Sequence, residues 1–294
     1  MARRRLLTGD ERRRLFDPPV QETAIIGHYT LSAEDVELVG RRYGPANRLG
    51  LAAQIALMRH PGFGLQPEIG LPDVILQYLA AQLFVDPSSF SAYGQRAQTR
   101  TDHADLVARY LGIRPFRRGD LALALNLAAQ AAEYTDRGEP IVRALMVGLK
   151  GERFILPSGD TLERAGLAGR ARARKAAAAA IVEGLSSAEL TRLDELVINN
   201  PDFGMTPLAW LRNFEEAPTA ANINGLLERL RYVRGIGIHP VVGGAIPEFR
   251  FAQFVREGGV APAFLLSDYS VNRRRATLTA AVIDLEARLA DAAI

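Results

Sequence analysis

The chain has 294 residues, a length that favours two or three folded units over a single core. Hydrophobic residues make up 48% of it and charged residues 23%, which is ordinary for a globular protein and argues against a disordered chain. It has no cysteine, which excludes disulfide bonds and thiolate metal ligands, and no apolar run reaches the roughly 20 residues that cross a bilayer. The basic start of the chain lacks the apolar stretch of a signal peptide. A cytoplasmic protein without a membrane partner is predicted.

The formal net charge is +3, and every cation except Lys150 and Lys175 is an arginine. Arginine is suited to bidentate contacts with phosphates and base edges. Biased codon usage also produces a chain rich in alanine and arginine, so composition by itself does not identify a nucleic-acid-binding protein.

Short helices separated by turn residues fill the first predicted unit, residues 1–118. Ser32 and Asp35 have the spacing of a capping box at the start of one helix. Asn47 is the expected N-cap of the next helix, which ends at Pro61-Gly62. These two helices and the short turn between them predict a helix-turn-helix-like pair.

Helical spacing of apolar residues predicts two more core helices in this unit, over residues 72–84 and 101–112. The second predicted unit, residues 119–185, shows two helical patterns, a short extended stretch at 154–157 and a further helix. This order predicts a winged-helix-like unit with a short β element. Its last helix carries the longest basic run without an acid, which is either a phosphate-binding segment or a solvated face.

The third predicted unit, residues 186–294, is also helical, so we expect an all-α fold of several small units. Ser186 with Glu189, and Thr206 before a proline, mark two helix starts, and Thr219 is the expected cap of a third. The last helix, from Val271 to the end of the chain, opens with three arginines. A helix N-terminus disfavours cations unless an anion lies there, which favours a nucleic-acid contact.

No motif for catalysis or metal binding stands out. The four histidines lack the spacing that would place two on one helix face, and each is expected to be a surface or hydrogen-bonding residue. The glycine cluster at residues 235–244 has Pro240 where a phosphate-binding loop needs a glycine. There is no Gly-x-Ser-x-Gly elbow, and no carboxylate is set in an apolar context. We therefore predict no catalytic site, metal, cofactor or small-molecule substrate in this chain.

Surface arginines remain as the candidate chemistry. Arg48 and Arg59 are eleven residues apart on one predicted helix, which returns them to the same face roughly 16 Å along its axis. They could contact successive phosphates, or form salt bridges with neighbouring acids. The predicted DNA-contacting residues are Arg41, Arg42, Arg48, Arg59, Arg170, Arg172, Arg174, Lys175, Arg273, Arg274 and Arg275.

Several long blocks of the sequence resemble, in the same order, the opening part of the replicative transposases of the Tn3 family. The blocks are RRRLLTGDERRRLFDPP, IIGHYTLSAEDVELVGRRYGPANRLGLAAQIALMRHPG, YLGIRPF, RFILPSGDTLERAGLAGRARA, GLSSAELTRLDELV, TPLAWLR, NINGLLERLRYVRGIGI and RRRATLTAAVIDLEARLADAAI. The resemblance spans essentially the whole chain. The stretch GIHPVVGGAIPEFRFAQFVREGG departs from it, being rich in glycine and proline where regular helices are expected.

Those transposases are bacterial and about three times as long, and their N-terminal third grips the terminal inverted repeats of the element. Their Asp-Asp-Glu strand-transfer site uses Mg²⁺ and lies in the C-terminal part. The resemblance therefore implies a DNA-binding region truncated before the catalytic domain, with duplex DNA at transposon ends as its partner.

Two alternatives remain open. One is a helical interaction module that associates with full-length transposase and regulates it, for which the last helix offers an apolar stripe of Leu278, Val282, Leu285 and Leu289. The other is a stand-alone enzyme, which would nick DNA strands in the presence of Mg²⁺.

Overall fold

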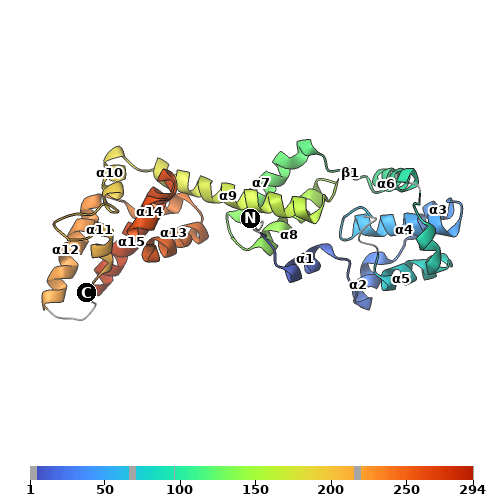
Figure 1. The fold of residues 1–294 in the computed structure, drawn as a ribbon, viewed down its shortest axis with the longest axis horizontal. Coiled ribbons are helices and arrows are strands. Elements are labelled where there is room, and N and C mark those ends of the chain that lie inside the picture. The colour runs from blue at the N-terminus through green and yellow to red at the C-terminus, as the bar shows by residue number, and fades with distance from the viewer. Residues whose placement is uncertain (1–4, 66–70, 96, 215–219, 294) are drawn as a thin grey trace. The chain divides into compact units, whose positions relative to one another are not determined.

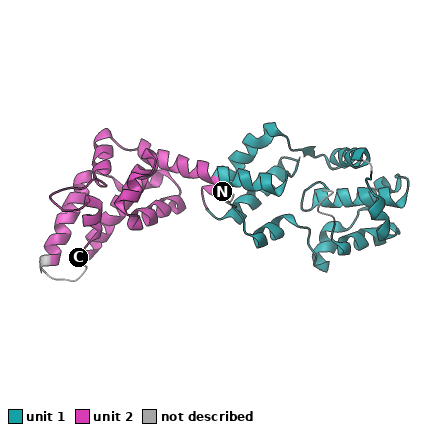
Figure 2. Cartoon of the chain, in the orientation of Figure 1, with its two compact units in different colours: residues 1–131, 136–169 teal, residues 132–135, 170–294 magenta. Residues whose placement is uncertain are grey.

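The computed structural model describes residues 5–65, 71–95, 97–214 and 220–293, and the predicted cap Thr219 lies outside them. Over these residues the fold is all-α, as predicted, with two short strands (Figure 1). The chain forms two compact units, of which the first comprises residues 1–131 and 136–169 and the second residues 132–135 and 170–294 (Figure 2).

The first unit contains α1 (Gly9–Phe16), α2 (Glu22–Tyr29), α3 (Ala33–Gly40), α4 (Pro45–Arg59), α5 (Asp73–Leu83), the 3₁₀ turn η1 (Pro87–Ala92), α6 (Ala97–Leu111), β1 (Arg114–Pro115), η2 (Arg118–Asp120), α7 (Leu121–Ala132, whose last residue groups with the second unit), α8 (Gly138–Gly151), β2 (Phe154–Ile155) and the first part of α9 (Gly159–Glu183).

Helix α4 is the centre of the first core. Its residues 49–58 are all buried, and α2, α3, α5 and α6 pack against it. Gly50 lies so close to the Tyr93 ring that a Cβ atom would come within 2.1 Å of it. Helix α4 is thus a core helix, and a helix buried over ten consecutive residues has little surface to place in a DNA groove.

The turn between α3 and α4 corrects one prediction. Ser32 caps α3 in the predicted capping box with Asp35. Asn47, however, does not cap α4, because the helix already begins at Pro45, two residues before Asn47. Gly44, with a φ of +80°, is the N-cap, and Pro45 is the first helical residue. The Asn47 side chain instead donates to the carbonyl oxygen of Tyr43 at 3.0 Å.

The extended stretch predicted at residues 154–157 includes β2, but its partner strand lies outside the predicted unit. β1 and β2 pair in parallel, with Arg114 opposite Phe154 and Pro115 opposite Ile155. Because β1 precedes residue 119, the pairing joins segments that the sequence assigned to two units. The predicted boundary at 118/119 thus falls inside the first observed unit, and the one at 185/186 falls inside the second.

The second unit contains the rest of α9, α10 (Ser187–Glu195), α11 (Pro207–Arg212), α12 (Ala220–Ile236), the 3₁₀ turn η3 (Pro240–Ala245), α13 (Glu248–Val260), α14 (Ala263–Ser267) and α15 (Val271–Ala292). The predicted helix starts at Ser186 and Thr206 are confirmed, since both side chains accept a hydrogen bond from a backbone amide of the first turn. The glycine- and proline-rich stretch is more regular than expected, because α13 occupies its second half.

Helix α15 is the centre of the second core, with α10, α12 and α13 packed on it. Its apolar stripe, Leu278, Val282, Leu285 and Leu289, is at most 3% exposed and belongs to this core. The proposal that this stripe receives a partner helix was therefore wrong, because the stripe already packs against helices of its own unit.

Candidate nucleic-acid interface

The turn between α3 and α4 presents cations and an aromatic ring to solvent. Arg41 pairs with Glu37 at 2.6 Å, and the Arg48 Nε donates to the carbonyl oxygen of Arg42 at 3.0 Å. Tyr43 is 95% exposed between them. The first turn of α4 has no acid and its N-cap is a glycine, so the positive end of the helix dipole lies beside these arginines. Such a turn could receive a phosphate group, with α4 itself remaining in the core.

Arg59, at the other end of α4, is committed to an ion pair. Its two terminal nitrogens donate to both carboxylate oxygens of Asp35, one of them at 2.6 Å, and Asp35 is completely buried. The Tyr110 hydroxyl donates to the same carboxylate at 2.8 Å, and the Ser32 amide donates to it at 2.8 Å. Burial raises the pKa of Asp35, but these hydrogen bonds outweigh it and hold that pKa below its ordinary value. Of the two interpretations of Arg59, the salt bridge is the one observed.

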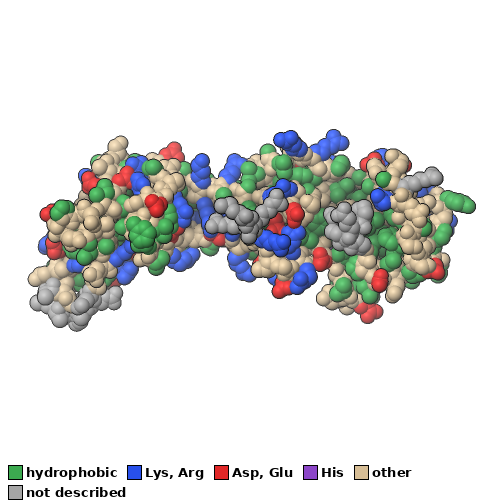
Figure 3. Space-filling view, viewed as in Figure 1, with side chains coloured by type: hydrophobic (Ala, Val, Ile, Leu, Met, Phe, Trp, Pro, Cys, Tyr) green, Lys and Arg blue, Asp and Glu red, His purple; other side chains and the backbone are tan. Residues whose placement is uncertain are grey.

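The basic run on α9 lies largely at the surface. Arg172, Arg174 and Lys175 are exposed and Arg170 is half-buried. Ala173, a residue of the same run, is buried. Basic side chains are spread over the face of the molecule that Figure 3 shows. Because Arg172 and Arg174 are two residues apart on a helix, their side chains leave it in different directions.

The three arginines that open α15 have acidic partners. Arg274 and Arg275 donate to the two carboxylate oxygens of Asp194, with shortest distances of 3.0 and 2.7 Å, and Arg273 pairs with Glu257 while stacking 3.7 Å from the Tyr269 ring. Burial raises the pKa of Asp194, but the hydrogen bonds from Arg275 and Arg274 outweigh it and lower that pKa. The Asp194 carboxylate is therefore an anion of the kind that the helix dipole favours at this end of α15.

Two histidines that are distant in the sequence are adjacent in the structure. The rings of His28 and His60 stack in parallel, 3.7 Å between centroids. Burial, then the neighbouring His28 and Lys150, lower the pKa of His60 to about 4. The pairing has no local sequence signal, because the two residues lie on α2 and at the end of α4.

A loss of stability in mild acid should follow from the low pKa of His60. Since the unfolded chain binds a proton near pH 6.5 and the folded chain only near pH 4, folding loses free energy as the pH falls between these values. We expect a loss of about 1–2 kcal/mol, reduced from the full shift because His60 is partly exposed. Urea unfolding at a series of pH values measures it, and His60→Gln should flatten the dependence. An equal slope in both proteins would contradict the assignment.

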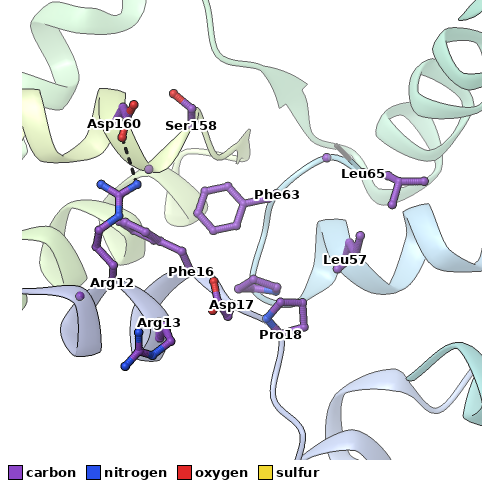
Figure 4. A pocket seen from close by; sticks show the side chains of 14 residues that line it. Arg12, Arg13, Phe16, Asp17, Pro18, Leu57, Phe63, Leu65, Ser158 and Asp160 are labelled. Carbon is purple, nitrogen blue, oxygen red and sulfur yellow. Dashed lines mark hydrogen bonds and ion pairs between the residues drawn. The ribbon is translucent and has the colours of Figure 1, made fainter. Parts of the chain in front are cut away.

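A pocket of about 490 Å³ lies in the first unit beside the start of α9 (Figure 4). The Phe16 and Phe63 rings meet edge to face at 5.8 Å on its wall. Arg12 also lines it and donates to Asp160 at 3.0 Å and to Glu163. The pocket is thus mostly apolar, and its most enclosed cation is already paired with carboxylates.

Within the described residues, no cluster of three or more histidine, aspartate or glutamate side chains is placed to hold a metal ion. Among those same residues, no helix combines the length and the apolar character needed to span a membrane.

Two exposed arginines that were not predicted from the sequence, Arg117 and Arg118, precede α7. The only signal for them in the sequence is that they form a basic pair at a helix start.

Comparison with known proteins relates this chain to a family of unknown function and to several transposases. The family described as a domain of unknown function (DUF4158) matches residues 6–168, a range that ends one residue before the first unit does. The chain is 33% identical over 291 residues to the transposase for transposon Tn501 of Pseudomonas aeruginosa, covering 99% of this chain and 30% of that protein. It is 33% identical to the transposase for transposon Tn3926 of Escherichia coli, over 99% of this chain and 29% of the relative. The corresponding values for the transposase for transposon Tn1546 of Enterococcus faecium are 27%, 99% and 30%.

The chain thus spans about 30% of the length of the curated relatives that it matches. The family match covers more than half of the chain, and the similarity to transposases extends from one end of it to the other. The chain belongs to the DUF4158 family and is homologous along nearly its whole length to Tn3-family transposases.

Proposed function

We propose that this chain is the DNA-binding part of a Tn3-type transposase, that it acts in the bacterial cytoplasm, and that it recognises the terminal inverted repeats of a transposon. The observation that carries the proposal is the homology to transposases over 99% of the chain. The exposed cations of α9 and of the α3–α4 turn support it. In this proposal the Mg²⁺-dependent strand-transfer site belongs to a part of the transposase outside the matched segment.

Affinity and specificity would come from different contacts. Arginines on phosphates supply a sequence-independent attraction that weakens steeply with salt, whereas base edges in the grooves supply sequence recognition. Arg172, Arg174 and Lys175 are suited to the first role, because they are exposed on one helix within a run that has no acid. The buried helix α4 is not suited to the second, so we expect base contacts from other elements.

Selection of bound DNA from a random duplex pool tests the proposal. Sequence-specific recognition predicts that one sequence is enriched, and recognition of terminal repeats predicts that this sequence occurs in inverted orientation at both ends of a mobile element. Fluorescence anisotropy then compares the enriched duplex with a scrambled duplex across a salt series. Equal binding of both would overturn specific recognition, and an affinity that does not change with salt would overturn phosphate contact.

The double variant Arg172→Ala with Arg174→Ala should bind duplex DNA more weakly. Each phosphate contact contributes about 0.9 to the slope of log K against log salt, so the slope should fall by roughly one for each contact that is lost. Helicity measured by circular dichroism should not change, because both side chains are exposed.

The matched control is Arg13→Ala with Arg143→Ala, two exposed arginines on α1 and α8 that pair with Asp10 and Glu139. This control removes the same charge from the chain, so its affinity should remain close to that of the wild type. If the α9 variant and the control bind equally well, the basic run of α9 is a solvated face.

A further inference from the structure

The pairing of β1 with β2 gathers four arginines that come from two distant segments. Arg114 lies in β1, Arg117 and Arg118 lie in the turn that follows it, and Arg153 immediately precedes β2. The Arg114 amide donates to the carbonyl oxygen of Arg153 at 2.8 Å, which fixes the two segments side by side. Arg117, Arg118 and Arg153 are exposed, as is 58% of the Arg114 side chain. We refer to these four residues as the strand-end arginines.

The charge around them is unbalanced. Residues 109–120 contain four arginines and one acid, Asp120, and residues 150–153 contain two cations and one acid, Glu152, so the two segments together carry six cations and two acids. Asp120 is already engaged, since it accepts from the Arg117 amide at 2.7 Å and from Arg114 at 3.3 Å. Figure 3 shows Arg and Lys side chains along the edge of the first unit where α7 begins in Figure 1. Cations therefore outnumber acids three to one over these two segments.

Two of the four arginines lie at positions where the stability of the fold alone would favour a different residue. Arg153 has a φ of +62°, a left-handed conformation that glycine adopts freely and other residues rarely adopt, at the position after α8 where glycine is common. Arg118 belongs to the turn that leads into the N-terminus of α7, where the helix dipole disfavours a cation. A cation at the C-terminal end of α8 does interact favourably with that helix dipole, so the experiment must separate this structural role from binding.

Stacking on an aromatic ring restrains the guanidinium group of Arg114. Its guanidinium stacks 3.8 Å from the ring centroid of Phe154, which is 2% exposed and meets Phe116 edge to face at 5.6 Å. An arginine restrained in this way loses less conformational entropy when it binds an anion. Exposed arginines on two paired segments are suited to contacts with more than one phosphate, and a duplex backbone provides several.

We infer that the strand-end arginines contact the phosphate backbone of duplex DNA and form a second contact surface, on the first unit, besides the α9 run and the α3–α4 turn. This inference rests on the proposed function and adds to it a surface that contains none of the arginines predicted from the sequence.

Fluorescence anisotropy of the full chain on a labelled duplex of mixed sequence, across a salt series, tests the inference. Arg117→Ala with Arg118→Ala should weaken binding roughly ten-fold or more at about 0.1 M salt and lower the salt slope by about two, because each phosphate contact contributes about 0.9. The charge-matched control Arg13→Ala with Arg143→Ala should keep the slope of the wild type.

Arg153→Gly separates binding from folding. Glycine accepts the left-handed conformation, so the melting temperature should hold or rise, while the salt slope should fall by about one. A melting temperature that drops while the slope is unchanged would show that Arg153 serves the helix end and not DNA.

Two results distinguish a failure of the proposed function from a failure of the inference about the strand-end arginines. If the wild type fails to bind duplex DNA even at low salt, the proposed function fails and the inference fails with it. If the wild type binds, and the Arg117/Arg118 variant binds with the same affinity and slope, the strand-end arginines are not a DNA contact and the proposed function is unaffected.

Discussion

Replacing Arg59 with alanine is expected to lower the free energy of unfolding by about 3–5 kcal/mol, the usual cost of removing one partner of a buried ion pair. The reason is an asymmetry in burial, since Asp35 is completely buried while 34% of the Arg59 side chain is exposed. Without Arg59, a carboxylate stays in the core and, among the residues that the structure describes, keeps the Tyr110 hydroxyl and the Ser32 amide as its donors. Urea unfolding followed by circular dichroism measures the loss.

The matched control for Arg59 is Arg48, an exposed arginine eleven residues earlier on the same helix. Arg48→Ala should change stability by less than about 1 kcal/mol, because the Arg48 side chain is exposed and bonds to the Arg42 carbonyl at the surface. Adding Asp35→Asn to the Arg59 variant should recover stability, since it removes the unpaired buried charge. Equal stabilities of the Arg59 and Arg48 variants would contradict the ion-pair account.

The pH dependence of stability provides an independent readout for the same pair. In the wild type the pKa of Asp35 lies below its ordinary value of 3.8, so its contribution is complete at neutral pH and is lost as the pH falls through the folded pKa. In the Arg59 variant burial remains while the main opposing hydrogen bonds are gone, so the pKa of Asp35 should rise above 3.8. Stability carried by this group should then increase as the pH falls through that raised value toward 3.8, which reverses the sign of the dependence.

Replacing Arg250 with methionine is expected to cost about 3 kcal/mol of stability. Arg250 is 1% exposed on α13 and donates to the carbonyl oxygens of Ala132 and Thr135, and to the Gln253 side chain at 2.7 Å. Methionine fills a similar volume but leaves buried carbonyl groups without a donor, and hydrogen bonds to a charged group are each worth about 1.5–3 kcal/mol. Chemical denaturation monitored by far-ultraviolet circular dichroism checks this value.

Two further variants provide stabilities to compare with that of Arg250→Met. Arg250→Lys should recover only part of the stability, because an ammonium group cannot reproduce the forked geometry of a guanidinium. Arg256→Met, at an exposed position on the same helix, should be within about 0.5 kcal/mol of the wild type. If Arg250→Met and Arg256→Met are equally mild, the buried hydrogen bonds of Arg250 contribute little to folding.

The helices of this chain could be predicted where their signals are local. Ser32 with Asp35 and Ser186 with Glu189 form the capping boxes expected from their spacing of three residues, and the last helix spans nearly the predicted range. Asn47 failed as a cap because the glycine and proline before it had already set the helix start. Local chemistry therefore predicts which segments are helical and, in most cases, where they begin.

The environment of the arginines could not be predicted in the same way. Arg59 meets an acid 24 residues away, Arg274 meets one 80 residues away, and Arg250 donates to a carbonyl 118 residues away. Each partner is set by how helices pack, and nothing in the neighbouring sequence marks it. The strand-end arginines were missed for the same reason, since only the pairing of β1 with β2 brings Arg114 beside Arg153.

The sharing of Asp194 by Arg274 and Arg275 has a consequence for how this sequence can diverge. One carboxylate serves two guanidinium groups, so the loss of Asp194 would leave two partly buried cations without their partner, whereas the loss of either arginine leaves one ion pair intact. Losing Asp194 should therefore lower the free energy of unfolding by more than losing either arginine alone. Of the three positions, 194 is the one expected to tolerate substitution least.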